Sequence, residues 1–335
     1  MRGPYDSNLK ICSYLNFCSN YCYGSHGPSP QKRSRIHHEV TQMPAPGAPA
    51  DMVMNSTAQW IFTLLHFAVA IGATVWIWRR WERADVRTAL LILVGGGLSI
   101  VAEPFFDRLG FIWHAKVGQW TAITMFGHSV PLWMLPVYYW FIGGQTIYLL
   151  KRMRSGATLG QMLKLSALFS FMDAVLELPI LYAGGVYTYF GQQPFYDPTW
   201  FPLPAWYIAA NGVLPITACA AVVLVSSLGD RRAQWLIPVV IPMSVFAVYA
   251  SFAWPIWAAL NADVSMAVSY LAGTATVVMA VFVQVLLTAV CVRAFRRGTT
   301  EAFWPGSASM SSVAEHGVQP GGSAPMSWSS SAQVL

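Results

Sequence analysis

Two carboxylates, Asp173 and Glu177, lie four residues apart inside the apolar stretch 163–189. On a helix, this spacing places both side chains on one face. The stretch is long enough to cross a lipid bilayer, where charged side chains are costly and normally face a protein interior or a water-filled cavity. Asp173 and Glu177 are therefore the first candidates for a functional site. The alternative is a structural polar contact between helices.

The chemistry open to such acids follows from their surroundings. Apolar neighbours disfavour the charged form of a carboxylic acid, so the acid can keep its proton at neutral pH. Aromatic faces stabilise nearby cations. A dry, aromatic-lined pocket is thus suited to protonating an alkene or epoxide, and to a carbocation rearrangement or cyclisation that ends when a base removes a proton. This chemistry needs neither a cofactor nor a metal ion.

The composition indicates which class of protein must position these acids. Hydrophobic residues make up 55% of the chain and charged residues only 10%, whereas a soluble domain carries about 25% charge. The formal net charge of +6 lies mainly in the connections between apolar segments, where the positive-inside rule accounts for it. The expected partners are therefore the lipid bilayer and a hydrophobic small-molecule substrate, without nucleic acid. Protein partners stay unknown.

Apolar segments separated by short polar connections begin at residue 57. Each is near or above the roughly 20 residues that a spanning helix needs. The sequence therefore predicts an all-α bundle of seven transmembrane helices. The predicted spans are 57–78, 88–110, 121–149, 163–189, 204–227, 235–259 and 266–292.

Basic residues predict the orientation of these spans. Only Arg108 and Lys116 lie in the connections on one side. The other side is therefore the cytosol, with the amino terminus outside and the carboxyl terminus inside. The residues on the cytosolic side are Arg79, Arg80, Arg83, Arg87, Lys151, Arg152, Arg154, Lys164, Arg231, Arg232, Arg293, Arg296 and Arg297.

The two ends of the chain differ in composition from the spans. Residues 1–56 are polar and rich in Pro, Gly and Ser, and the end of the chain is rich in Ser and Gly. Such composition is typical of disordered segments. The predicted domains are a disordered tail over 1–56, the transmembrane domain over 57–293 and a disordered tail over 294–335.

Polar residues of the spans can be placed in depth at about 1.5 Å of rise per residue. His128 is expected on the third span, about 10 Å below the outer surface, and Asp107 falls near that surface. Sequence does not show how each helix is rotated, so their convergence is an inference from depth alone. The polar groups in one outer-half band are His66, Glu103, His128, Asp173, Glu177 and Asn211.

Tryptophans bracket this band. An interfacial aromatic belt explains most of them, but Trp133 and Trp254 lie deep enough to line a pocket. The predicted catalytic residues are Glu103, Asp173, Glu177 and His128, with Asp173 or Glu177 as the acid and one of the others as its partner. The predicted substrate-binding residues are Asn211, Trp133, Trp206, Trp254, Asp107 and His66.

Four stretches resemble the emopamil-binding-protein superfamily, which includes sterol isomerases, and the related seven-span terpene cyclases of meroterpenoid pathways. All four lie within residues 98–215 of the 335. They are LSIVAEPFFD (98–107), TMFGHSVPLW (124–133), FMDAVLELP (171–179) and PAWYIAANGVLP (204–215).

The resemblance implies that membrane-embedded acids move a proton onto and off a double bond, while an Asn and a Trp line the site. Glu103 and Asn211 match this pattern by position, and Asp173 and Glu177 match its later acids. His128 is outside the pattern, and an acid expected early in the third span of the isomerases has no counterpart. The resemblance therefore favours a cyclase or isomerase of another isoprenoid over a sterol isomerase.

Other classes of membrane protein compete with this interpretation. A retinal protein is excluded because the stretch 269–290 contains no Lys to form a Schiff base. A proton-coupled transporter also uses intramembrane acids and histidines, but the inner half of the spans is almost free of ionisable groups. A non-catalytic lipid- or sterol-binding protein would use the same pocket without chemistry.

Overall fold

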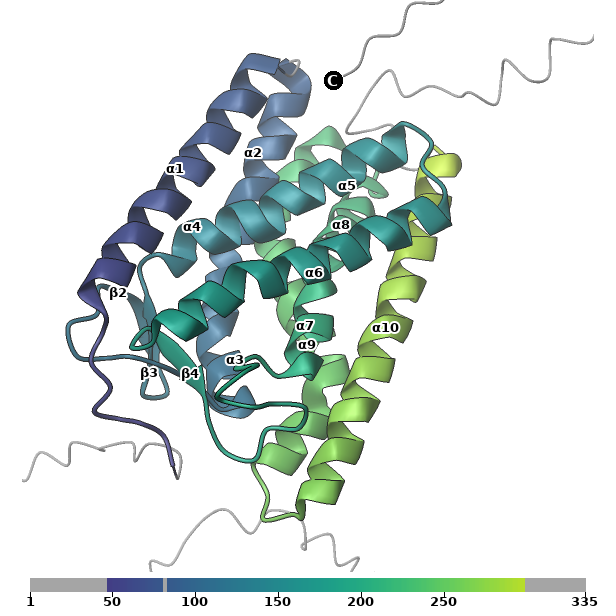
Figure 1. Cartoon of the computed structure of the whole chain (residues 1–335). Helices are drawn as coiled ribbons and strands as arrows, with labels where there is room; N and C mark the ends of the chain where they lie inside the picture. Colours follow the sequence, from purple (N-terminus) through teal and green to yellow (C-terminus); the bar gives the residue numbers. More distant parts are fainter. Residues whose placement is uncertain (1–46, 81–82, 299–335) are drawn as a thin grey trace, which may run out of the picture. The chain divides into compact units, whose positions relative to one another are not determined.

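The structure, a computed structural model, describes residues 47–80 and 83–298 (Figure 1). Within these ranges, six helices are long and apolar enough to cross a membrane. The chain thus has the helix lengths and composition of a multi-pass, all-α membrane protein. The six candidate spans are Ser56–Arg79, Asp85–Gly110, Leu159–Ala183, Ala205–Ser226, Arg231–Leu260 and Met266–Arg296.

Several of these spans are assembled from shorter elements. A 3-10 turn, Ser99–Ala102, separates α2 from α3, and another, Arg231–Leu236, precedes α9. The helices that make up the six spans are α1 (Ser56–Arg80), α2 (Arg83–Leu98), α3 (Glu103–Gly110), α6 (Leu159–Ala183), α7 (Ala205–Gly212), α8 (Leu214–Ser226), α9 (Ile237–Leu260) and α10 (Met266–Arg296).

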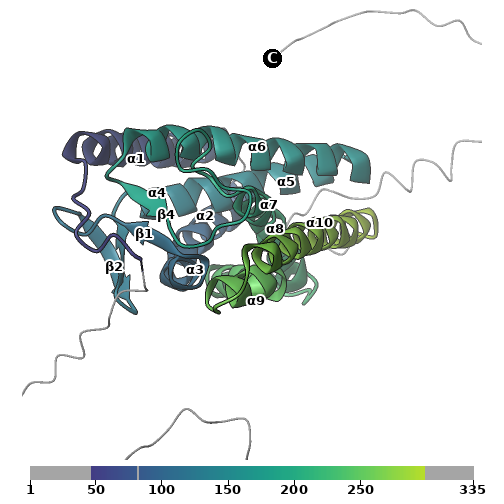
Figure 2. The ribbon, with the colours of Figure 1, turned by 60° about the horizontal axis from the view of Figure 1, so that its bottom comes forward.

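The helices pack in layers around a buried apolar core. Helix α9 contacts α2, α8 and α10, and α10 also contacts α6 and α7. Figure 2 shows α1 and α6 along one side of the bundle and α9 and α10 along the opposite side. Ile241 of α9 is buried against α2, where a Cβ atom at Gly95 would lie 3.0 Å from its side chain.

The third predicted span, 121–149, is not one helix. Its first part is a hairpin of β2 (Thr121–Met125) and β3 (His128–Pro131). Phe126 and Gly127 form the turn with φ of 52° and 76°, the left-handed backbone that a two-residue hairpin needs. Apolar β-branched residues on both sides of this turn extended the apolar run and hid the boundary.

Helical structure resumes after the hairpin and continues to Arg154. It consists of α4 (Met134–Tyr138), a π-helical segment (Tyr139–Gly144) and α5 (Gln145–Arg154), of five, six and ten residues. The π-helical segment offsets the two α-helical halves by one residue relative to a continuous α-helix. This segment lies outside the six candidate spans.

A second two-stranded ladder joins segments that are distant in sequence. Strand β1 (Ile112–His114) pairs antiparallel with β4 (Tyr187–Tyr189), placing His114 opposite Tyr187. The fourth predicted span, 163–189, is therefore too long by its last residues. Helix α6 ends at Ala183 because Gly184 and Gly185 adopt positive φ of 67° and 63°.

The described residues also adjust the predicted tails. Residues 47–55 precede α1, and within them Met54 is buried and donates its backbone N–H to Val117 at 2.8 Å. At the other end, α10 continues to Arg296, beyond the predicted boundary at 293. Residues 1–46 and 299–335, predicted to be disordered, lie outside the described residues.

Close packing at Gly96 holds α2 against the π-helical segment. A Cβ atom at Gly96 would lie 2.5 Å from the backbone nitrogen of Gly143, and one at Gly143 would lie 2.8 Å from the Cα of Leu93. Real Cβ atoms do not approach backbone this closely, so both positions need glycine. Small residues at a helix contact allow this backbone approach in membrane proteins.

Gly96→Ala should therefore destabilise the protein by about 1–3 kcal/mol, the usual cost of overpacking. Gly72→Ala is the matched control, because a Cβ atom there meets nothing within 4 Å and alanine favours the helix. Thermal melting of both variants in the same detergent measures the effect. Equal melting temperatures would contradict the close contact.

Candidate active site

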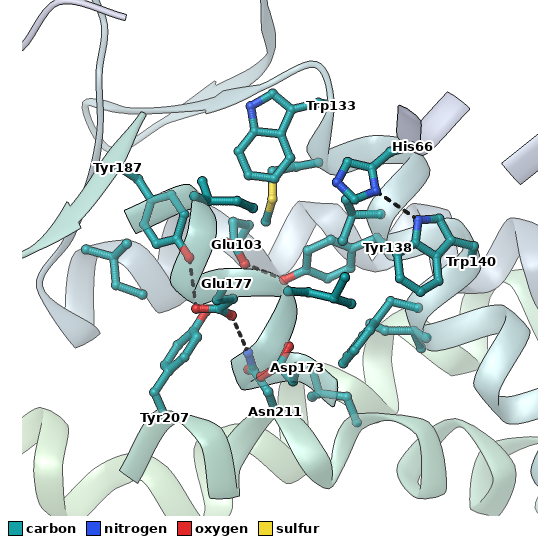
Figure 3. Close-up of a pocket in the computed structure, with 18 of the residues that line it drawn as sticks. His66, Glu103, Trp133, Tyr138, Trp140, Asp173, Glu177, Tyr187, Tyr207 and Asn211 are labelled. Carbon is teal, nitrogen blue, oxygen red and sulfur yellow. Dashed lines mark hydrogen bonds between the residues drawn. The ribbon is translucent and has the colours of Figure 1, made fainter. Parts of the chain in front are cut away.

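One cavity lies among α1, α3, α4, the π-helical segment, α6 and α7, with a volume of about 80 Å³. This is smaller than the roughly 300–1,000 Å³ of pockets that hold a drug-sized ligand. Most of its walls are apolar or aromatic (Figure 3). Of the residues singled out from the sequence, those that line the cavity are His66, Glu103, Trp133, Asp173, Glu177 and Asn211.

Asp173 and Glu177 lie one turn apart on α6 and face the cavity (Figure 3). Glu177 accepts three hydrogen bonds: from the hydroxyls of Tyr187 at 2.9 Å and Tyr189 at 3.2 Å, and from the Asn211 amide at 3.1 Å. By contrast, Oδ2 of Asp173 is buried without a hydrogen-bond partner among the described residues. The two acids therefore have different surroundings.

Two local features place α6 beside α7. A reciprocal capping box begins α6: the Thr158 hydroxyl accepts from the Gln161 backbone at 3.3 Å, and the Gln161 side chain accepts from the Thr158 backbone at 2.9 Å. At the helix contact, a Cβ atom on Gly212 would overlap the side chain of Ser170. Glycine at 212 thus lets α7 approach α6 and brings Asn211 within reach of Glu177.

Glu103 reaches the cavity from another helix. It is the first residue of α3, where the chain leaves the 3-10 turn, and Pro104 follows in the first helical turn. Proline is favoured there because its missing N–H would have no helical partner. The Tyr138 hydroxyl donates a short hydrogen bond to Oε2 of Glu103. This bond links α3 to the residue that precedes the π-helical segment.

An aromatic wall surrounds His66 of α1. Its ring stacks against Trp133, with centroids 6.0 Å apart, and against Trp140, with centroids 5.8 Å apart. The Trp140 indole donates to Nδ1 of His66 at 3.3 Å (Figure 3). Ring faces of this kind stabilise positive charge in a desolvated site, so this wall suits a cationic intermediate.

Two predicted tryptophans do not line the cavity. Trp254 is 59% exposed on α9, whose buried face instead presents Ala253 and Ile256. The sequence did not predict which face of α9 is buried, because this helix is apolar on all faces. Trp206 is fully buried in the core, where its indole donates to the Gln193 side chain at 3.1 Å. Its role is to hold the loop before α7.

His128 is also outside the cavity lining, because it belongs to the β2–β3 hairpin and not to a helix. Its ring packs edge-on against Trp113 at 5.1 Å. Burial lowers the pKa of His128 to about 4, and the charges of Arg108 and Lys116 contribute to the shift. The structure therefore separates His128 from the acids with which it was grouped.

Asp107 lies just behind the cavity wall, fully buried and next to a histidine that the sequence interpretation missed. This residue, His114, lines the cavity from β1. Its Nε2 lies 3.6 Å from Oδ2 of Asp107 and 3.8 Å from Oε1 of Glu103. Burial lowers the pKa of His114, but the two carboxylates outweigh burial and raise it to about 9.

Tyrosine hydroxyls also contribute to the site, although no tyrosine was among the predicted site residues. Tyr138, Tyr187 and Tyr207 line the cavity, and Tyr189 reaches Glu177 from the β4 strand. The pattern Tyr-Thr-Tyr at 187–189 is a strand signal, since aromatic and β-branched residues favour strands. It places both outer tyrosines on one face, and both bond to Glu177.

The fold and site together define a multi-pass helical membrane protein with carboxyl groups from two spans in an aromatic-lined cavity. An acid with one oxygen that lacks a hydrogen-bond partner among the described residues, a second carboxyl that accepts three hydrogen bonds, and cation-stabilising rings are suited to moving a proton onto and off an apolar molecule. Comparisons with protein-family models, with curated proteins and with solved structures find no match to this chain.

Proposed function

We propose that this protein is an integral-membrane cyclase or isomerase of a hydrophobic isoprenoid, which acts by protonating an alkene or an epoxide. The observation that carries the proposal is the meeting of Glu103, Asp173 and Glu177 in one aromatic-lined cavity. Burying three carboxyl groups among apolar side chains is costly, and such acids are typical of functional sites.

In this proposal, Asp173 donates the proton. Its unpartnered Oδ2 atom is free to hold a proton toward a bound double bond or epoxide oxygen. Glu177 is the complementary proton acceptor in this proposal, because three donated hydrogen bonds offset part of the cost of a buried carboxylate. After the carbocation rearranges, Glu177 accepts the proton that leaves, and a proton returns from Glu177 to Asp173, one turn away on α6, before the next turnover. The net reaction adds and removes no atoms, so the product is an isomer of the substrate.

The remaining walls hold the substrate and exclude water. His66, Trp133 and Trp140 line the cavity, and the ring of His66 stacks against both tryptophans. Glu103 lies on another wall, with Tyr138 bonded to it. The apolar lining suits a prenyl chain or a small ring system, which reaches the site from the bilayer and moves side chains apart to make room.

We also propose that the helical residues from Met134 to Arg154 are a seventh span, and that the amino terminus lies outside. Twenty-one helical residues extend about 30 Å, the thickness of the hydrocarbon core. Lys151, Arg152 and Arg154 lie in the last turn of α5. The end of the bundle where α1 and α5 finish lies opposite the β strands (Figure 1). Arg154 of this end pairs with Asp85 at 3.0 Å.

Full-length protein in lipid nanodiscs can be tested with two probes, a farnesyl-type terminal epoxide and a sterol with a ring double bond. We expect at least one probe to give a product of unchanged mass in ordinary water. In deuterium oxide, the product of the probe that is protonated at a double bond should carry one deuterium on carbon. The added proton comes from a carboxylic acid that exchanges with the solvent. Mass spectrometry after gas chromatography reads both results.

Competing functions give different results in the same preparation. A lipid-binding protein retains the probe unchanged, and a proton-coupled transporter acidifies or alkalinises proteoliposomes when substrate is added. The proposal would be contradicted if both probes bind in the cavity and neither is converted to a product. Asp263→Asn is the matched control for acid variants, because Asp263 is exposed between α9 and α10.

A further inference from the structure

Glu103, Asp107 and His114 form a compact buried cluster at the edge of the cavity. Glu103 and Asp107 lie one turn apart on α3, so both point to the same side of the helix. Phe111 then adopts a left-handed conformation with φ of 56°, which ends α3 and turns the chain into β1. The pairing of β1 with β4 fixes His114 over the two acids.

The separations within this cluster are too long for hydrogen bonds. Nε2 of His114 lies 3.6 Å from Asp107 and 3.8 Å from Glu103, whereas hydrogen bonds are about 2.7–3.2 Å long. One ligand atom from each residue lies within 4.8 Å of the others. Ligands bound at roughly 2.0–2.2 Å to one tetrahedral ion are about 3.3–3.6 Å apart. The observed spacing therefore leaves room for a shared ion.

Hydrogen-bond accounting points to the same missing group. Both carboxylate oxygens of Asp107 and both ring nitrogens of His114 are buried without a hydrogen-bond partner among the described residues. Asp107 is 0% exposed and His114 is 5% exposed. Each unsatisfied buried polar group costs about 1–3 kcal/mol, and more when it is charged. An ion between them would satisfy the carboxylate and the imidazole nitrogen together.

The donor set indicates the class of ion. Two carboxylates neutralise the charge of a divalent cation, which matters in apolar surroundings. An imidazole nitrogen combined with carboxylate oxygens suits Zn²⁺ and neighbouring transition metals more than Mg²⁺ or Ca²⁺, which prefer oxygen ligands alone. Three protein ligands leave a fourth position for water or a ligand.

We propose that Glu103, Asp107 and His114 bind one divalent transition-metal ion, with Zn²⁺ as the first candidate. Glu103 and His114 line the cavity whereas Asp107 lies behind its wall, so the open position would face the cavity. The inference does not rest on the proposed function. It is compatible with it, because the proton transfers are assigned to Asp173 and Glu177.

The test uses full-length protein purified in detergent through an affinity tag without histidine. Zn²⁺ is added, excess is removed by gel filtration, and bound metal is measured by plasma mass spectrometry. We expect about one Zn²⁺ ion per wild-type chain. In Asp107→Asn, the affinity for Zn²⁺ should fall about tenfold or more, so that the ion is lost during gel filtration. Asp173→Asn is the matched control, since it alters another buried aspartate and should retain the ion.

A second measurement covers variants that fail to fold. Co²⁺ added to the wild-type protein should give the visible absorption of a tetrahedral nitrogen and oxygen site, and excess Zn²⁺ should abolish it. Folded wild-type protein that gives no such spectrum and binds no Zn²⁺ would overturn the proposal and leave an ion pair of His114 and Asp107 only. Equal metal content in Asp107→Asn and Asp173→Asn would also overturn it.

Discussion

Asp173→Asn should reduce turnover by roughly 10²–10⁴-fold, the usual contribution of a positioned acid. The amide has the shape of the carboxyl group but cannot donate a proton of comparable acidity. Because Oδ2 of Asp173 has no hydrogen-bond partner among the described residues, the substitution should cost little folding stability. Initial rates with the reactive isoprenoid probe, measured beside melting temperature, separate the two effects.

The control for this variant is Asp263→Asn, which should keep the wild-type rate because it lies on the exposed α9–α10 connection. Asp173→Glu is a useful companion, since it retains an acid but extends it by one methylene and should recover part of the activity. Full activity in Asp173→Asn would assign the proton transfer to another group and remove the proposed mechanism.

Glu177→Gln should affect both turnover and stability. The carboxyl group accepts hydrogen bonds from Tyr187, Tyr189 and Asn211, which are all donors. With the glutamine oxygen toward Asn211, the amide nitrogen faces the two tyrosine hydroxyls, which must then accept instead of donate; losing the charged acceptor costs about 1–3 kcal/mol. Loss of the base should lower turnover by roughly 10²-fold or more.

The single variant Tyr189→Phe provides the comparison for Glu177→Gln. It removes only the longest of the three hydrogen bonds, at 3.2 Å, and leaves the carboxyl group in place. We expect a smaller loss of turnover and of melting temperature than in Glu177→Gln. If Tyr189→Phe equals Glu177→Gln in rate, the carboxyl group acts only through its hydrogen bonds and not as a base.

Much of the fold follows from apolar length. Six of the predicted spans correspond to helices that are long and apolar enough to cross a membrane in the described part of the chain. The prediction of one helix over 121–149 was wrong because hydropathy does not distinguish an apolar hairpin from a helix. The turn at Phe126 and Gly127, flanked by Thr, Ile and Val, was the signal that separates them.

The candidate site was predictable where polar residues mark one face of an otherwise apolar helix. Asp173 and Glu177 face inward together because an acid within a membrane span normally faces the protein interior or a water-filled cavity. Glu103 and Asn211, which are also polar residues within apolar helices, face the cavity for the same reason. Trp254 gave no such information, because tryptophan is stable in lipid, at an interface or in a pocket. The sequence therefore did not predict that Trp254 is exposed on α9, because this depends on which face of α9 packs against the other helices.

His114 could not be placed from the sequence for a different reason. Its position beside Glu103 depends on the left-handed turn at Phe111 and on pairing with Tyr187, which is more than 70 residues away in the chain. Periodicity describes faces within one helix, whereas this pairing joins two short strands, β1 and β4. Long-range strand pairing of three residues leaves only a weak pattern in a sequence dominated by apolar spans.

The π-helical segment Tyr139–Gly144 makes the aromatic wall sensitive to chain length as well as to residue type. A π-helical turn accommodates one extra residue, so deleting one residue from this segment would allow an uninterrupted α-helix whose two halves face as they do now. The change would fall on the cavity wall itself, because Tyr138, Trp140, Phe141 and Ile142 all line the cavity and an α-helical turn holds one residue fewer.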